Sequence, residues 1–304
     1  MKKILSLLLL SVLLVSLFSC GGGEKKSEAY LGLGHVIDHE EYPGNPVHFV
    51  YVAAAVIDGK EETVISIALD AYMATATVGE GGICEEGSAE SATASAIGAD
   101  SFKAMIADIT EKVVGKTADE IEALGEAETE DEVAHMYTAL AYAVRTAKSP
   151  CAKTDKPGVA IAGKMSVKNA DPLSETNGNV TSEIDVAAVA LNADGKVSGA
   201  AIDAMTVKRE FDASGTLIAP AAVKTKRELG YDYGMKEISG IKREWFEQAE
   251  GFCAYLSGKT AEEIGAIGVA NGYPTEDALL SSCTIAISGM IAVSVAAATA
   301  AAAE

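Results

Sequence analysis

Basic residues are scarce in this sequence, and the motifs of several enzyme classes are missing. The chain has 24 Lys and Arg residues against 44 Asp and Glu, a formal net charge of −20. An acidic surface of this kind repels phosphate backbones, which excludes nucleic acid as a partner. The sequence also lacks a Gly-x-Ser-x-Gly nucleophile elbow and a His/Cys nucleophile pairing. Nothing in it therefore indicates hydrolytic chemistry.

Cysteine motifs are missing too. After Cys20 the sequence contains only Cys84, Cys151, Cys253 and Cys283, at irregular spacings. There is no Cys-x-x-Cys pair and no haem-attachment motif, which excludes those redox sites. Disulfides are chemically possible outside the cytoplasm, but the spacing favours no particular pairing.

A phosphate-binding P-loop is also missing, although Gly-Lys-Thr occurs twice. The motif requires a glycine five residues before Gly115 or Gly258, and Thr110 and Cys253 stand there instead. Each glycine follows a helical pattern and precedes a Thr-x-x-Glu capping box. We therefore predict that one helix ends, and the next begins, at each Gly-Lys-Thr.

Three histidines near the N-terminus are candidate ligands of a metal ion. His35 and His39 are four residues apart, and His48 follows. On a helix this spacing would present two ligands to one ion. The glycines and prolines around them favour a loop instead. We expect exposed histidines and no metal site.

The first residues are typical of a bacterial lipoprotein signal. Lys2 and Lys3 precede an apolar run that is too short for a transmembrane helix and ends just before Cys20. We predict a signal peptide over 1–19 and a lipidated Cys20 with a flexible tether over 20–29. The protein would then be anchored to a membrane of the cell envelope by lipid and face outside the cytoplasm. The alternative is an ordinary secretory peptide with an incidental cysteine.

The sequence after the N-terminal segment contains an internal duplication. Residues 113–125 recur as 256–268, and an upstream segment with Asp58-Gly59-Lys60 recurs with Asp194-Gly195-Lys196. We predict two tandem, duplicated repeats over 30–148 and 158–304, joined by a polar linker. The segment 79–99 is expected to loop out, and the alanine-rich C-terminus to form a fraying helix.

Each repeat combines two periodicities. Alternating small and β-branched residues flank the Asp-Gly turns, which predicts β-hairpins. Trp245, Ala249, Phe252 and Leu256 then lie at helical spacing, as do Phe102, Ile106, Ile109 and Val113 in the first repeat. The predicted fold is α+β, with two small antiparallel sheets, each packed by two or three helices.

The second repeat contains a Lys-rich stretch with Tyr233-Gly234-Met235 that the first repeat lacks. A predicted helix that starts at Trp245 with Glu-Gln-Ala follows it, and residues 275–285 come later. In this order the segments resemble the FMN-binding domain family, in its membrane-anchored lipoprotein branch. The resemblance covers roughly residues 180–300. In flavinylated members, the threonine of an Asp-Ala-x-Ser-Gly-Ala-Thr motif carries FMN through a phosphoester bond made by a separate transferase.

The resemblance implies particular site residues. Thr284 matches the threonine that carries FMN and Ser281 matches the family serine, while Ser282 and Cys283 replace the family Gly and Ala. Asp277 lies one residue further from the threonine than in the family. The implied isoalloxazine would lie against Tyr231, Tyr233, Met235 or Trp245, and Gly234 is a further implied cofactor-binding residue.

Two functions remain open from the sequence. One is a flavin-carrying electron-transfer lipoprotein that depends on a flavin transferase and a membrane redox partner. The other is a cofactor-free surface lipoprotein used for ligand binding or assembly, favoured by the altered motif and by its absence from the first repeat. Either would be a carrier or binding protein rather than an enzyme.

Overall fold

A computed structural model describes residues 27–39, 41–42, 45–85, 90–94 and 98–303. The predicted signal peptide, Cys20 and most of the tether lie outside these residues. The chain combines helices with antiparallel sheets, which confirms the α+β class. Within the described ranges, no helix has the length and apolar character needed to cross a bilayer.

The two halves contain the following elements. The first half has β1 (Ala29–Asp38), β2 (Glu41–Tyr42), β3 (Asn45–Asp58), β4 (Val64–Thr75), β5 (Val78–Gly79), β6 (Ile83–Cys84), β7 (Glu90–Thr93), α2 (Ala99–Val113), α3 (Ala118–Ala127), α4 (Asp131–Thr146) and β8 (Ser149–Cys151). The second has β9 (Lys156–Lys168), β10 (Gly178–Leu191), β11 (Val197–Phe211), α5 (Lys226–Leu229), a 3-10 helix (Gly230–Tyr233), α6 (Met235–Ile238), α7 (Trp245–Leu256), α8 (Ala261–Gly265), β12 (Val269–Ala270), β13 (Tyr273–Pro274), α9 (Asp277–Leu280) and α10 (Ser288–Ala303).

Both halves are built on a three-stranded meander followed by helices. The first sheet has the order β7-β4-β3-β1-β8, with β2 paired to β3, and the second has the order β11-β10-β9. The last long helix of each half lies on the first two long strands of its own sheet, α4 on β1 and β3, and α10 on β9 and β10. The halves therefore share one order of elements, while their origin by duplication stays a prediction.

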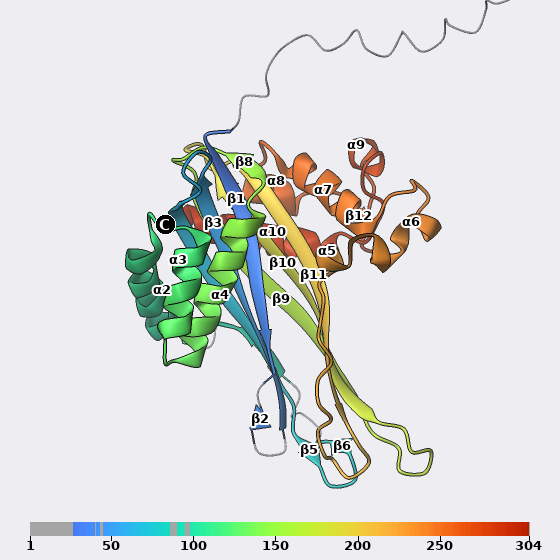
Figure 1. Ribbon diagram of the computed structural model, residues 1–304. Helices are drawn as coiled ribbons and strands as arrows, with labels where there is room; N and C mark the ends of the chain where they lie inside the picture. Colours follow the sequence, from blue (N-terminus) through green and yellow to red (C-terminus); the bar gives the residue numbers. More distant parts are fainter. Residues whose placement is uncertain (1–26, 40, 43–44, 86–89, 95–97, 304) are drawn as a thin grey trace, which may run out of the picture.

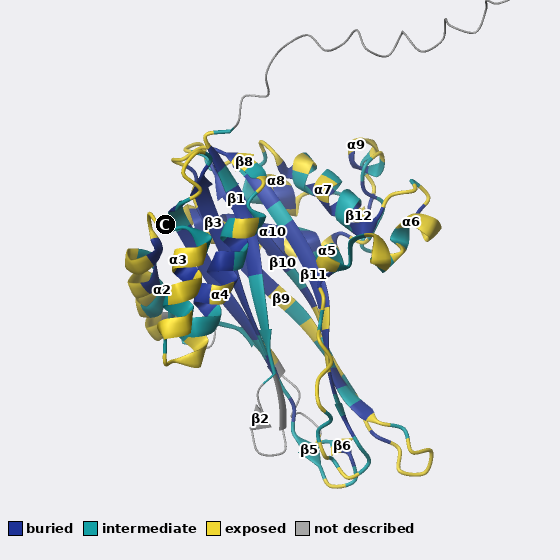
Figure 2. Ribbon diagram, in the orientation of Figure 1, coloured by how far each residue is buried: buried dark blue, intermediate teal, exposed yellow. Residues whose placement is uncertain are grey.

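The two sheets pack face to face, and helices cover their outer faces (Figure 1). Side chains such as Val52 and Val56 from the first sheet meet Ile184 and Val186 from the second in one apolar layer between the sheets. Buried residues are concentrated in the strands, and the solvent side of α2 and α3 is exposed (Figure 2). The architecture is a four-layer α/β/β/α sandwich with aligned sheets.

The locally encoded features are present as predicted. The Asp-Gly turns connect β3 to β4 and β10 to β11. The hydroxyls of Thr117 and Thr260 accept hydrogen bonds from the third residue of α3 and α8, completing two capping boxes. Gly115 and Gly258 adopt the left-handed conformation, with φ of 81° and 78°, where a helix ends.

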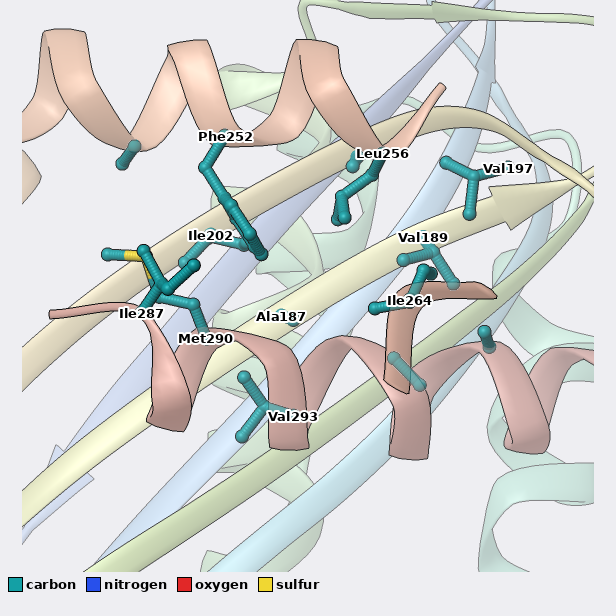
Figure 3. Packing of buried hydrophobic residues seen from close by; sticks show 14 of the residues in the cluster. Ala187, Val189, Val197, Ile202, Phe252, Leu256, Ile264, Ile287, Met290 and Val293 are labelled. Carbon is teal, nitrogen blue, oxygen red and sulfur yellow. The ribbon is translucent and has the colours of Figure 1, made fainter. Parts of the chain in front are cut away.

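The expected apolar helix faces also form the core. In the second half, Phe252 and Leu256 of α7 and Met290 and Val293 of α10 point toward the outer face of the second sheet (Figure 3). In the first half, Ile109 and the other members of the predicted face pack on the first sheet. These helices are stabilised by their burial against a sheet.

The C-terminal helix corrects one prediction, because it is packed rather than frayed. Ala297, Ala298 and Ala301 of α10 are fully buried. The helix lies so close to β9 that a Cβ on Gly158 would come within 2.1 Å of the Ala297 carbonyl oxygen. Small side chains on both elements permit this approach, so the alanine run defines a close-packed face.

Two segments expected to be irregular contain strands. The 79–99 stretch includes β6 and β7, and β7 pairs with β4; residues 86–89 and 95–97 lie outside the described ranges. The expected linker contributes β8, which pairs with β1 through Ser149–Cys151. Short strands of polar and small residues give a weak periodic signal, which is why the sequence did not predict them.

The edges of the sandwich differ. Along one edge, β4 and β9 lie close together, and a Cβ on Gly163 would meet the Tyr72 ring at 2.7 Å. Along the opposite edge, β1 and β11 approach less closely, and β8 contacts both. One edge is therefore closed by β4 and β9, and the other is bridged by β8, whose Ser149 hydroxyl accepts a hydrogen bond from the Ala200 amide of β11 at 3.0 Å.

The histidine prediction is wrong, because the residues lie in or beside strands rather than in an exposed loop. His35 is part of β1, where it pairs with Val52, and His48 is part of β3 and fully buried. The alternation of apolar residues along both strands outweighs the local glycines and prolines. Among the described residues, no three His, Cys, Asp or Glu side chains gather as a metal site would require.

His48 belongs to a polar layer inside the sandwich. Its Nδ1 lies 3.5 Å from the Ser182 hydroxyl, to which the Tyr72 hydroxyl donates at 3.4 Å. The His39 ring stands edge-on to the His48 ring at 5.6 Å. Arg209 of β11 is only 2% exposed. Polar groups buried at such a junction make the stability of the fold sensitive to their protonation.

We predict that His48 causes stability to fall in mild acid. Burial, followed by the nearness of His39 and Arg209, lowers the pKa of His48 from 6.5 to about 4. The unfolded chain therefore binds a proton before the folded chain does, and the folded state loses roughly 3 kcal/mol as the pH falls through this interval. Urea unfolding across that range should show a steep loss for the wild type and a smaller one for His48→Asn. Equal slopes for the two proteins would contradict this assignment.

Candidate functional site

Most residues implied by the family resemblance gather at one end of α7. Trp245 starts that helix and is 3% exposed, and the segment with Tyr233 and Met235 packs against the same cluster. The Met235 amide donates to the Glu244 carboxylate at 2.8 Å, which holds α6 against the start of α7. Cys283 is buried in the cluster as well.

A fully buried glutamine connects this cluster to Thr284. Oε1 of Gln248 accepts from the Thr284 amide at 2.9 Å and from its hydroxyl at 3.1 Å. Nε2 of Gln248 donates to the Ser239 hydroxyl at 3.1 Å and to the Arg243 carbonyl at 3.0 Å. Both ends of the side chain are thus satisfied, as a buried amide requires. Gln248 fixes the turn that carries Thr284 to α7.

Lys226 completes the aromatic part of the cluster. Its ammonium lies 5.6 Å from the centroid of the Tyr233 ring and 5.2 Å from that of Trp245. These are cation–π distances. Because Trp245 is buried under this cover, its ring face is not open to a planar ligand.

Other implied residues lie away from the cluster. Asp277 and Ser281, at either end of α9, are exposed. Ser282 is half-buried and packs on α7, where a Cβ on Gly251 would come within 2.8 Å of its own Cβ. Gly234 forms an exposed left-handed turn with φ of 75°.

The start of α10 already holds an acidic side chain. A carboxylate oxygen of Asp185 lies 1.9 Å from the position that a Cβ on Gly289 would take. The N-terminus of a long helix attracts negative charge, and a phosphate there would compete with this carboxylate. Burial raises the pKa of Asp185, an effect that Lys226 partly offsets.

A large cavity lined by described residues lies elsewhere, at the edge of the sandwich where β8 contacts β1 and β11. It has a volume of about 1090 Å³ and lies between α4, β1 and β8 of the first half and β11, α5 and α7 of the second. We call it the edge cleft. Leu31, Leu33, Ala200 and Ala201 give it apolar walls, and Tyr142 and Phe246 contribute aromatic rings.

Charged contacts cross the edge cleft from one half to the other. The Lys148 ammonium lies 2.8 Å from Oε1 of Glu250, which the Arg227 guanidinium also contacts at 3.2 Å. Nearby, the Tyr142 hydroxyl donates to Glu228 at 3.4 Å, and His35 lies 3.7 Å from the same carboxylate. Five of these six side chains line the cavity itself, and the sixth, His35, contacts its lining residue Tyr142.

Protonation in the edge cleft is shifted by burial. Asp203 is 5% exposed, and desolvation raises its pKa although Thr225 and Arg227 donate hydrogen bonds to it. Burial, with Glu228 and Asp203 nearby, raises the pKa of Tyr142 to about 12. Burial also raises the pKa of the Cys253 thiol to about 11, so it is protonated and poorly reactive at neutral pH. No disulfide joins the cysteines of the described residues.

Sequence reasoning missed the edge cleft. Its residues come from positions as distant as Leu31 and Ser257 and share no motif. Arg227 and Glu228 lie within the Lys-rich stretch, yet their partners Tyr142 and Glu250 are far away in the sequence. The available signal was the charged Glu250 beside the predicted apolar face of α7.

Comparison with known proteins adds no relative: no family model, curated protein or solved structure matches this chain. The resemblance to the FMN-binding family therefore rests on the quoted motifs alone.

We predict that Gln248 stabilises the Thr284 turn. Gln248→Leu removes four hydrogen bonds from a dry site, and should cost about 2–4 kcal/mol of unfolding free energy. Thr284→Val, which removes only the hydroxyl bond, should cost about 1 kcal/mol. Urea unfolding measures both, and amide exchange at Thr284 should quicken in the leucine variant. Equal losses from the two substitutions would show that the glutamine does not hold this turn.

Proposed function

We propose that this chain is a lipid-anchored protein of the cell envelope that faces outside the cytoplasm and binds a small molecule in the edge cleft. The observation that carries the proposal is the cavity itself, of about 1090 Å³, with walls from both halves. It combines apolar surface with a few charged groups, which is the usual character of a ligand site.

The position of the cleft also favours binding. Apart from the polar layer at His48, apolar side chains from the inner faces of the sheets fill the rest of the sandwich, whereas β1 and β11 approach each other less closely at their shared edge. The Lys148–Glu250 and Tyr142–Glu228 contacts connect the halves across the opening. Groups held in this way are pre-organised, which lowers the cost of binding.

The predicted anchor suits a binding protein of this kind. The lipoprotein signal ends at Cys20, and residues 20–29 would act as a flexible tether. A tethered receptor of this design captures its ligand near the membrane surface.

We predict that filling the edge cleft removes a natural ligand. Ala254 is an exposed residue of α7 that lines the cavity, so Ala254→Trp should block it without entering the core. Ala123→Trp, at an exposed position of α3, is the matched control. The full chain would be isolated from its own envelope, and the small molecules released on denaturation compared by mass spectrometry. A compound present with the wild type and the control should be missing from Ala254→Trp; identical contents in all three would refute the proposal.

A second candidate is a flavin carrier, with FMN on Thr284 and a membrane redox partner. It is favoured by the way Tyr233, Met235 and Trp245 gather with Thr284 around Gln248. When bound, FMN would supply electron transfer. The buried Trp245 ring and the Asp185 carboxylate at α10 limit the room for it, which places this candidate second.

The flavin candidate makes a prediction of its own. After co-expression with a flavin transferase, the mature chain should gain the mass of one FMN less one water and show flavin absorbance. Thr284→Val should abolish both signals, and Thr299→Val, at an exposed threonine of α10, should keep them. A colourless chain of unmodified mass would end the covalent version.

A further inference from the structure

The charged side chains around the edge cleft differ in how they are paired. Three cationic side chains line it, and each is matched by carboxylates: Arg145 contacts Asp119 and Glu122, while Lys148 and Arg227 share Glu250. Asp203 and Glu228 bring further negative charge to the lining. Three carboxylates, Asp203, Glu228 and Glu250, thus line the cleft together with the three cations.

Glu228 differs from the other carboxylates in its partners. It accepts hydrogen bonds from the Thr225 amide at 2.8 Å and from the Tyr142 hydroxyl at 3.4 Å, and it lies 3.7 Å from His35. Among the described residues it has no Lys or Arg partner. With 31% of its side chain exposed, it can still accept a hydrogen bond from a ligand in the cleft.

Aromatic and apolar groups lie next to this carboxylate. The Tyr142 ring stands edge-on to His35 at 5.1 Å, and Phe246 stands edge-on to Tyr231 at 5.3 Å. Both Tyr142 and Phe246 line the cavity. Aromatic faces attract organic cations, and the apolar walls suit a hydrocarbon body.

The net charge of the chain also favours a cationic ligand. At −20, the protein raises the local concentration of cations and lowers that of anions. An anionic ligand would also have to share Lys148 and Arg227 with Glu250, which already pairs with both cations.

We propose that the edge cleft binds an amphipathic amine, with its ammonium group on Glu228 beside Tyr142 and its apolar part against the walls near Leu33, Ala201 and Phe246. This inference rests on the proposed function and names the chemical class of its ligand. The ammonium of the ligand supplies a permanent cation, which Glu228 does not find among the described Lys and Arg residues.

Three phenylalkyl probes of similar size and different charge test the assignment. Phenethylamine, 2-phenylethanol and 3-phenylpropionate would be titrated into the mature wild-type chain by calorimetry or NMR. The amine should bind about tenfold more tightly than the alcohol, since a charge-assisted hydrogen bond is gained. Among the three probes, added salt should weaken the binding of the amine only.

Glu228→Gln is the decisive variant. The side-chain oxygen of a glutamine can still accept the hydrogen bond from the Thr225 amide in the α5 capping box. The fold is therefore retained while the charge is lost. Affinity for the amine should fall about tenfold and affinity for the alcohol should stay the same. Glu126→Gln, at an exposed acid of α3, is the matched control and should change neither.

The outcomes separate this inference from the proposed function. If 3-phenylpropionate binds best and Ala254→Trp abolishes its binding, the cleft is a ligand site but the amine assignment is overturned. If the amine binds equally well to Glu228→Gln or to Ala254→Trp, it binds elsewhere and the inference fails. Loss of amine binding in both variants, with the control unchanged, supports it.

Discussion

The packing of two sheets against each other is the constraint on which the rest of this molecule depends. Neither sheet could be stable alone, because each has one face rich in Val, Ile and Ala that must be buried. Burying these faces against each other leaves the outer faces for helices. The small residues at Gly158 and in α10 then bring a helix close to its sheet. The four-layer order follows from this one requirement.

The locally encoded parts of the fold could be predicted from sequence. The Asp-Gly turns, the capping boxes of Thr117 and Thr260 and the helical stripe of α7 depend on residues a few positions apart. The packing of α10 could not be predicted in this way, because its alanine face is defined by a glycine on a distant strand. Strand β1 was missed for a related reason: its glycines provide room for α4 rather than a turn.

The candidate site, too, could be predicted only in part from the sequence. The sequence brought together Trp245, Met235 and Thr284 through one resemblance, and these residues are neighbours in space. It did not reveal that Gln248, 36 positions before Thr284, joins them. Nor could it reveal the edge cleft, where Tyr142 meets Glu228 across 86 positions. Contacts between residues so far apart in the sequence depend on how the two sheets pack against each other. No local sequence pattern encodes that packing.

The closed edge of the sandwich has a consequence for how this protein could diversify. Gly163 and Tyr72 set the separation of the sheets on the side opposite the cleft. Since both sheets are stiff, a change of side-chain volume there would tilt one against the other and alter the width of the distant opening. The width of the edge cleft could thus be adjusted during evolution by substitutions at residues that do not line it.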